Sequence, residues 1–495
     1  MNDIIVPTAS DYIRFLPEII LTIVGTLVMV LEAVSGTRSR RPLGILALVG
    51  VSAAMVAAFY AAGTPGQAFL GFINYDRYGA FFCELVLAVG FLTLLLSFNF
   101  LNREKSETGE YYALILFSLV GQCILATAND LIMVFIGLEI SSIATYVLAG
   151  FLRDDRRNNE AAIKYFLLGS FATAFLLFGT AWIYGVLGST NLDEINRVLG
   201  DRGLSSPNFT VLIGAAAALT FVGFAFKVSA APFQVWAPDV YQGAATPVTA
   251  FMVTGSKAAA FAVFFRVFTN AFGPISDRWV PFVWACALLT MIIGNFAALG
   301  QTNVKRLLAY SSIAHAGYIM VALTANSAIG TAAMMFYLAS YALMNIGAFA
   351  VITRISSRGE RYVHIKDLAG LYRREPATAA LLTVFVFSLI GVPLTGGFFA
   401  KFYVFRAALD SHLVWLTVLG LANSAVATYY YLKILVAVYM QEPGEATEHL
   451  EPLAPGLGVT IWATALGTLI LGIFPSTLLS YVSTSASALM GRLAP

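Results

Sequence analysis

Long apolar segments separated by short polar connectors make up almost the whole chain. A helix needs about 20 consecutive, mostly apolar residues to cross the hydrocarbon core of a bilayer. The pattern therefore predicts an all-α polytopic membrane protein with about 14 transmembrane helices. The fourth and fifth segments are the least clearly separated, because only Asn129 and Asp130 interrupt them. The predicted spans are residues 15–34, 43–63, 78–101, 111–128, 130–151, 161–187, 210–240, 246–269, 280–300, 304–324, 327–353, 377–408, 412–440 and 456–480.

The composition is typical of a membrane protein. Of the 495 residues, 59% are hydrophobic and only 11% are charged, which excludes a large soluble catalytic domain. The net charge is +2 and the basic residues are scattered, so no nucleic-acid-binding surface is predicted. The N-terminal apolar run has no small-residue cleavage site, and we expect it to be retained as the first span.

Cysteine and histidine are too sparse to predict a metal centre. Cys83, Cys123 and Cys286 stand far apart in apolar segments, without a CxxC pair or a histidine at ligand spacing. No glycine-rich turn follows a soluble strand, so no nicotinamide or nucleotide site is predicted either. We therefore expect no metal and no cofactor in this chain, and any associated redox chemistry should take place in another chain.

Lysine and arginine are distributed unequally between the two sides of the predicted bundle. Connectors that follow odd-numbered spans hold about 16 of them, against roughly 7 on the opposite side. Because basic connectors tend to remain in the cytoplasm, both termini are predicted to lie on the periplasmic side.

Two related halves are indicated by a self-comparison at an offset of 170 residues, which aligns SSIA at 141–144 with SSIA at 311–314. Pro232 and Pro393 each interrupt a long apolar segment, one in each half. Proline lacks an N–H donor and clashes with the preceding turn, so each segment is predicted to be a discontinuous helix. Repeats offset by five helices must have opposite topology. The predicted organisation is an N-terminal three-helix segment (1–110), two inverted five-helix repeats (111–269 and 280–440) and a C-terminal helix (441–495).

Several ionisable residues stand out well inside the predicted spans. A charge at the centre of an isolated helix costs about 2.5–3.5 kcal/mol on insertion scales, so these side chains should face the bundle interior. Groups in such a setting can exchange protons near neutral pH, which indicates a proton path. The alternatives are lysines that reach toward a membrane interface and a buried carboxylate or imidazole that only ties helices together. The residues are Glu139, Lys227, Lys257, His315, Lys401 and Lys433.

Several segments resemble the antiporter-like membrane subunits of respiratory complex I, NADH:quinone oxidoreductase. The longest is KVSAAPFQVWAPDVYQGAATPVTAFMVTGSKAAAFAVFFR, at residues 227–266. FIGLEISSIATYVLAGF, VKRLLAYSSIAHAGY and PLTGGFFAKFYVF carry the same resemblance, which covers essentially the whole chain. Within that family the chain is most similar to the subunit N group, whose mitochondrial counterpart is subunit 2.

The resemblance implies two half-channels that are joined by a central polar axis. Glu139 would be paired with Lys227, and Gln234 stands where relatives commonly carry a histidine. GAP is also frequent where this chain has Gly243, Ala244 and Ala245. The residues that match the axis are Glu139 in the fifth span, Lys227 in the broken seventh, Lys257 in the eighth, His315 in the tenth and Lys401 in the broken twelfth, joined by Lys433 in the thirteenth.

The implied function is proton translocation by one subunit of a translocase in the bacterial inner membrane. The partners would be other membrane-arm subunits of complex I, including neighbouring antiporter-like subunits, and membrane lipids. Flavin, iron–sulfur clusters and quinone would belong to other subunits. Two alternatives remain open: a subunit of a cation/proton antiporter with the same fold, and a scaffolding subunit whose lysines only stabilise packing.

Overall fold

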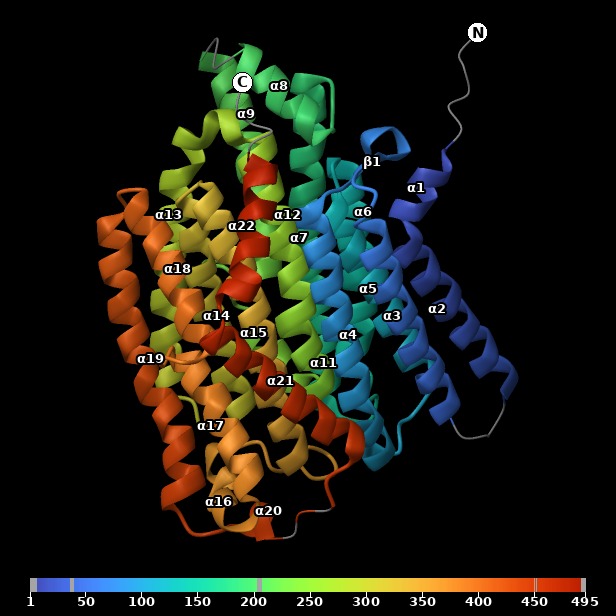
Figure 1. Ribbon diagram of the computed structural model, residues 1–495, viewed down its shortest axis with the longest axis vertical. Helices are drawn as coiled ribbons and strands as arrows, with labels where there is room; N and C mark the ends of the chain where they lie inside the picture. Colours follow the sequence, from blue (N-terminus) through green and yellow to red (C-terminus); the bar gives the residue numbers. More distant parts are fainter. Residues whose placement is uncertain (1–6, 36–39, 203–206, 449, 451, 491–495) are drawn as a thin grey trace.

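The computed structural model describes residues 7–35, 40–202, 207–448, 450 and 452–490. Most helices run along the long axis of one elongated bundle (Figure 1). Within the described residues, thirteen helical segments are long and apolar enough to cross a membrane. The predicted all-α polytopic fold is therefore confirmed.

The first part of the chain forms seven helices and a small hairpin. The strands β1 (Gly66–Ala68) and β2 (Ile73–Tyr75) pair antiparallel around the 3₁₀ turn η1 (Phe69–Gly71), between the third and fourth helices. The helices are α1 (Ala9–Arg14), α2 (Leu16–Ser35), α3 (Arg41–Ala61), α4 (Arg77–Glu104), α5 (Gly109–Thr127), α6 (Leu131–Ala149) and α7 (Arg156–Leu187).

The remainder of the chain is again helical, with several interruptions. The elements up to the tenth span are α8 (Leu192–Arg202), α9 (Pro207–Val228), α10 (Ala237–Gly243), α11 (Thr246–Phe251), the π-helical turn η2 (Met252–Ser256), α12 (Lys257–Arg266), the π-helical turn η3 (Val267–Ala271), the 3₁₀ turn η4 (Gly273–Ile275), α13 (Ser276–Leu299) and α14 (Val304–Thr324). They are followed by α15 (Ala328–Ile355), the 3₁₀ turn η5 (Ile365–Leu368), α16 (Leu371–Arg374), α17 (Pro376–Ile390), α18 (Gly396–Asp410), α19 (Val414–Met440), α20 (Glu445–Glu448), α21 (Pro455–Ile473) and α22 (Ser476–Met490).

Both predicted helix breaks are present. The seventh predicted span is divided between α9 and α10, and the twelfth between α17 and α18, with Pro232 and Pro393 in the breaks. Neither α17 nor α18 reaches the length of a complete span, so this broken helix accounts for the difference between thirteen long segments and the fourteen predicted spans.

Polar groups inside the bundle satisfy the backbone that each break frees. The main-chain N–H of Ala231 donates to Thr290 Oγ1 at 2.8 Å, and Trp236 Nε1 donates to the main-chain oxygen of Phe226 at 3.0 Å. At the second break, the N–H of Gly397 donates to Ser388 Oγ at 3.0 Å. Irregular backbone is tolerated at membrane depth only with such internal partners, as the sequence led us to expect.

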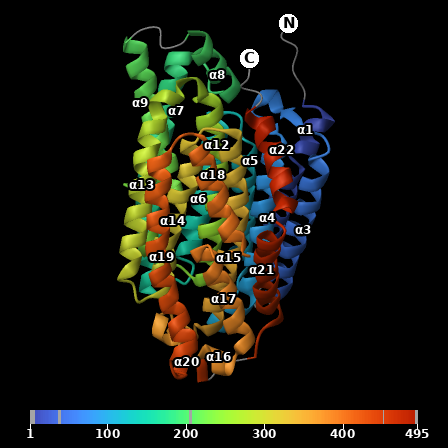
Figure 2. The same ribbon diagram turned by 60° about the vertical axis from the view of Figure 1, so that its left-hand side comes forward.

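Burial distinguishes central from peripheral helices. The span Thr246–Ala271, built from α11, η2, α12 and η3, is buried all round, and α14 and α15 are almost completely buried. By contrast, only 28% of the apolar stretch of α2 is buried. The helices α21 and α22 follow one another along α4 and α15 (Figure 2). The helices that carry Lys257 and His315 are therefore shielded by other helices rather than exposed to lipid.

The two ends of the bundle differ in the elements that they carry. In Figure 1, α1, α8 and the end of α22 lie at one end, and α16 and α20 lie at the other. The first and last described helices thus end on the same side, as an even number of crossings requires.

Candidate proton path

Lys227 lies near the end of α9, just before the first helix break. Its side chain is 5% exposed, and its amine donates to Ser142 Oγ at 2.8 Å and to the Tyr165 hydroxyl at 3.1 Å. Because Ser142 is on α6 and Tyr165 is on α7, three helices meet at this amine.

Glu139 lies one turn before Ser142 on α6. Its Oε1 atom is buried and has no hydrogen-bond partner among the described residues. The direct Glu139–Lys227 pair expected from the sequence is not formed in this structure, because the amine bonds to Ser142 and Tyr165 instead. Glu139 and Ser142 nevertheless lie on the same face of α6, three residues apart.

Hydroxyl and amide groups lead from this site toward the centre of the bundle. Ser141 directly precedes Ser142, which binds Lys227. Its hydroxyl forms a hydrogen bond with that of Ser118 on α5, with 3.2 Å between the two Oγ atoms. Gln122 Nε2 donates to Ser118 Oγ at 3.1 Å and to Ser256 Oγ at 3.3 Å. Ser256 is the last residue of η2, directly before the central lysine. No sequence motif had pointed to Ser118, Gln122 or Ser256 as members of this network.

Lys257 occupies the centre of the bundle at the start of α12. Its side chain is 1% exposed, and its amine donates to the main-chain oxygen of Ser312 at 3.0 Å and to Ser312 Oγ at 3.1 Å. The π-helical turn η2 directly before it interrupts the regular hydrogen-bond ladder, and such turns are frequent at functional sites. The amine is thus held by neutral oxygens of a neighbouring helix.

His315 lies one turn after Ser312 on α14. Its Nδ1 atom is 2.7 Å from the Tyr337 hydroxyl, and its Nε2 atom is 3.2 Å from the Tyr431 hydroxyl. The Tyr431 hydroxyl also hydrogen-bonds to Ser311, next to the serine that binds Lys257. Hydroxyl groups both donate and accept hydrogen bonds, so this arrangement can pass a proton in either direction.

Lys401 lies on α18, just beyond the second helix break. Its amine donates to the main-chain oxygens of Leu389 at 3.1 Å and Ile390 at 2.8 Å, which the break leaves without helical partners, and to Ser424 Oγ at 2.9 Å. The amine is also 5.2 Å from the ring centre of Tyr318, one turn after His315 on α14. Lys401 therefore binds the carbonyl groups that the break frees and lies beside α14, the helix that carries His315.

Lys433 lies on a branch of this network. Tyr318 accepts a hydrogen bond from Asn295 Nδ2 at 3.1 Å, and Asn295 Oδ1 accepts one from the Tyr430 hydroxyl at 3.0 Å. One turn farther along both helices, the Lys433 amine donates to the main-chain oxygen of Leu299 at 2.8 Å. Lys433 is only partly buried and lines a cavity of about 640 Å³ that opens at the surface.

Four lysines belong to the candidate path: Lys227, Lys257, Lys401 and Lys433. The path lysines have a different kind of partner from the buried cations Arg266 and Lys305. Arg266 forms a bidentate ion pair with Asp76, and Lys305 pairs with Glu360 at 2.7 Å. The hydrogen bonds of the path lysines, in contrast, all go to neutral oxygens. A buried ammonium without a counter-ion is costly, so these amines depend on their hydrogen bonds to neutral oxygens.

A separate charged cluster is centred on Asp239 of α10, which lies outside the thirteen long apolar segments of the described residues. Asp239 accepts hydrogen bonds from Lys164 Nζ and from Arg306, both at 2.7 Å. Partial burial raises the pKa of Asp239, but the hydrogen bonds and positive charges of these two partners outweigh it and hold the pKa below its ordinary value. The cluster borders a cavity of about 180 Å³ next to the first broken helix.

The SSIA repeat is the sequence signal that could have located the missed hydroxyl groups. Ser142 in the first copy binds Lys227, and Ser312 in the second copy binds Lys257. The two copies therefore supply the same kind of acceptor to two different lysines.

Comparisons with known proteins show which family the chain resembles over most of its length. The family described as NADH:quinone oxidoreductase/Mrp antiporter, TM, matches residues 128–427. The chain is 60% identical over 480 residues to NADH-quinone oxidoreductase subunit N 1 of Solibacter usitatus, covering 97% of this chain and 98% of the relative. It is 44% identical over 466 residues to subunit N of Trichlorobacter lovleyi, covering 94% and 95% of the two chains.

Solved structures show the same fold. A chain of respiratory complex I from Thermus thermophilus with bound aureothin superposes with a TM-score of 0.80 at 34% identity, covering 94% of this chain and 98% of that chain. A chain of the Mrp complex from Dietzia has a TM-score of 0.84 at 22% identity, covering 96% and 97%, which is a likeness of fold. This chain therefore belongs to the NADH:quinone oxidoreductase/Mrp antiporter family of membrane proteins and, within it, to the NADH-quinone oxidoreductase subunit N group.

Proposed function

We propose that this chain is a proton-translocating membrane-arm subunit of a bacterial NADH:quinone oxidoreductase. The observation that carries the proposal is the line of buried amines Lys227, Lys257 and Lys401, which hydroxyl groups and His315 connect. Their hydrogen bonds go to neutral groups, so each amine can take up or release a proton without breaking an ion pair. The high identity to complex I subunits over the whole chain favours this function over that of a cation/proton antiporter.

Proton movement along the path is controlled by the environment of Lys227. When Glu139 approaches the amine, the carboxylate stabilises its positive charge, and when the two separate the proton is released toward Lys257. A charge-assisted hydrogen bond contributes about 1.5–3 kcal/mol, and moving one charge across 100 mV requires about 2.3 kcal/mol. Making or breaking one such contact is therefore on the scale of one transfer step. The proton then passes His315 to reach Lys401, and Lys433 provides an outlet through its surface cavity.

Electron transfer from NADH to quinone takes place in other subunits, which hold the flavin, the iron–sulfur clusters and the quinone. This chain contributes the proton path and contacts neighbouring membrane-arm subunits and lipids. The segments 111–269 and 280–440 act as two inverted half-channels, each with one broken helix. The basic connectors face the cytoplasm, which places both termini in the periplasm.

The proposal is tested with Lys257→Met in the assembled complex, in inverted membrane vesicles. NADH-driven proton uptake, followed by a pH-sensitive dye, should be lost, while the complex retains its full set of subunits. Lys105→Met, at an exposed position after α4, is the matched control and should pump normally. Normal pumping by both Lys257→Met and Lys227→Met would favour a scaffolding role. Sodium-dependent proton exchange without NADH would favour the antiporter.

A further inference from the structure

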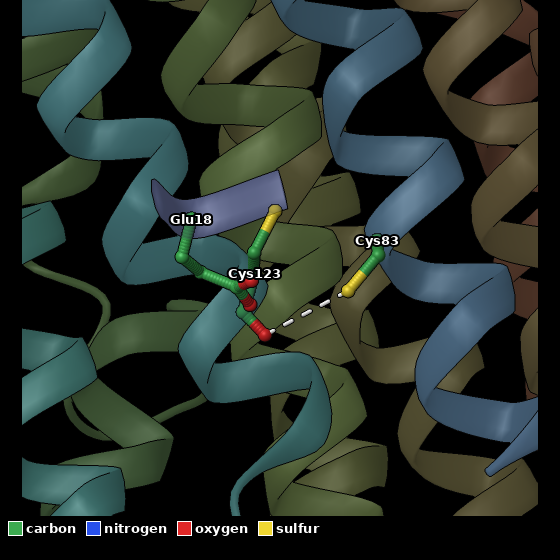
Figure 3. Close-up of side chains that lie close together, drawn as sticks. All are labelled: Glu18, Cys83 and Cys123. Atoms are coloured by element: carbon green, nitrogen blue, oxygen red, sulfur yellow. Dashed lines mark hydrogen bonds between the residues drawn. The ribbon is translucent and has the colours of Figure 1, made fainter. Parts of the chain in front are cut away.

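A second polar cluster lies in the N-terminal helices, outside the residues of the proton path. Glu18 in the first turn of α2, Cys83 on α4 and Cys123 on α5 lie side by side in the interior (Figure 3). Glu18 is 1% exposed and both cysteines are 0% exposed. One carboxylate oxygen and the two sulfur atoms all lie within 4.8 Å of one another.

The carboxyl group of Glu18 is buried and lacks a hydrogen-bond partner among the described residues. Neither of its oxygens makes a hydrogen bond within the part of the chain that the structure describes. Inside the cluster, Cys83 donates a long hydrogen bond of 3.8 Å to the main-chain oxygen of Cys123. A buried carboxyl without partners must remain neutral or bind a cation, because an isolated buried charge is too costly. The two thiols, which can bind a cation, have their sulfur atoms within 4.8 Å of one of its oxygens.

We propose that Glu18, Cys83 and Cys123 form a binding site for a thiophilic divalent cation, Zn²⁺. Zinc binds cysteine sulfur at about 2.3 Å and carboxylate oxygen at about 2.0–2.2 Å, usually in tetrahedral geometry. Two sulfurs on one tetrahedral zinc ion are about 3.8 Å apart. The three groups therefore need to approach one another by at most about 1 Å.

The charge and ligand types select this class of ion. Two thiolates neutralise one Zn²⁺ ion, the carboxyl oxygen supplies a third ligand, and up to three protons leave when the ion binds. Mg²⁺ and Ca²⁺ prefer ligand sets made only of oxygen, so the two sulfurs disfavour them. Bound zinc would link α2, whose apolar stretch is only 28% buried, to α4 and α5.

The cluster lies near one end of the bundle. Glu18 lies near the start of α2, Cys83 is in the second turn of α4, and Cys123 is one turn before the end of α5. At 1.5 Å per helical residue, all three lie within about 10 Å of the ends of their helices. The β1–β2 hairpin, which leads directly into α4, lies at the same end of the bundle (Figure 1).

The test uses the intact complex, first treated with a chelator and then exposed to Zn²⁺ alone. Zinc content is compared between the wild type and the double variant Cys83→Ser/Cys123→Ser, with Cys286→Ser as the matched control on α13. The wild type and the control should each bind one more zinc ion per chain than the double variant. Glu18→Gln preserves the shape of the side chain and should weaken zinc binding at least about tenfold, since even outer-shell partners contribute that much.

A second measurement needs no variant. Alkylation of each cysteine by a membrane-permeant maleimide is followed by mass spectrometry with and without Zn²⁺. Zinc should slow the modification of Cys83 and Cys123 at least about tenfold and leave Cys286 unaffected. Equal zinc contents of the wild type and the double variant would overturn the proposal. An unchanged zinc affinity in Glu18→Gln would also overturn the proposal. This measurement is decisive if the double variant fails to assemble.

Discussion

The bidentate ion pair between Arg266 and Asp76 should be one of the most sensitive contacts of the bundle. Arg266 is the last residue of α12, the helix that begins with Lys257, and Asp76 is the N-cap of α4. Both N–O distances are 2.9 Å, and the two side chains are 1% and 10% exposed. The guanidinium also donates to the main-chain oxygen of Ala126 at 3.2 Å and lies 5.0 Å from the ring centre of Tyr78.

Replacing Asp76 by Asn should destabilise the protein by about 3–5 kcal/mol, because it leaves a buried guanidinium without its counter-ion. The asparagine still caps α4, where the Asp76 carboxylate accepts a hydrogen bond from the N–H of Gly79 at 2.7 Å. The loss of stability in Asp76→Asn therefore measures the contribution of the ion pair rather than that of the helix cap. The contacts of Arg266 to Ala126 and Tyr78 remain, so we expect a value near the lower end of the range.

The assay measures the free energy of unfolding of the purified complex in detergent. The release of this chain from the complex during denaturation is the signal that reports unfolding. Glu194→Gln is the matched control, because its pair with Arg197 is 46% and 68% exposed and should contribute at most about 1 kcal/mol. Removing both charges with Asp76→Asn/Arg266→Met should restore part of the loss. A cost for Asp76→Asn no larger than that of Glu194→Gln would refute the reasoning.

Two further predictions concern packing and pH. A methyl group at Gly121 would lie 2.4 and 2.5 Å from main-chain atoms of α6, so Gly121→Ala should force α5 and α6 apart and lower stability by about 1–3 kcal/mol. Gly185→Ala, which meets nothing within 4 Å, should be neutral or slightly stabilising in the same thermal denaturation, and equal effects of the two changes would contradict this account. Lys164 and Arg306 hold the pKa of Asp239 below its ordinary value, so the carboxylate stabilises the folded state above about pH 4 and this contribution disappears as the pH falls through the lowered pKa. The Tm difference between the wild type and Asp239→Asn should therefore shrink from pH 7 to pH 3, and a constant difference would show that the ion pairs do not contribute.

The spans, both helix breaks and the buried lysines Lys227, Lys257 and Lys401 could be predicted from the sequence alone. The bilayer imposes a minimum length of apolar residues on every crossing helix, so the spans can be read from local composition. Proline acts on its own backbone, so Pro232 and Pro393 mark both breaks without any knowledge of neighbouring helices. Lys257 and Lys401 stand out because a charge in an apolar run is rare and costly.

The contacts between polar groups depend on how the helices pack, which local sequence does not reveal. Ser142, Ser312 and Gln122 resemble the other small or polar residues of membrane helices until helix packing places them beside an amine or a serine. The same packing leaves Glu139 without the direct lysine contact that the family resemblance had implied, because the amine bonds to Ser142 and Tyr165.

The cysteines show the limit of sequence spacing most clearly. Cys83 and Cys123 are 40 residues apart, and their spacing predicted no metal site. The packing of α4 against α5, with the start of α2 beside them, nevertheless brings both sulfurs to Glu18. Distance along the chain limits only local contacts, whereas contacts between helices depend on how complete helices pack against one another.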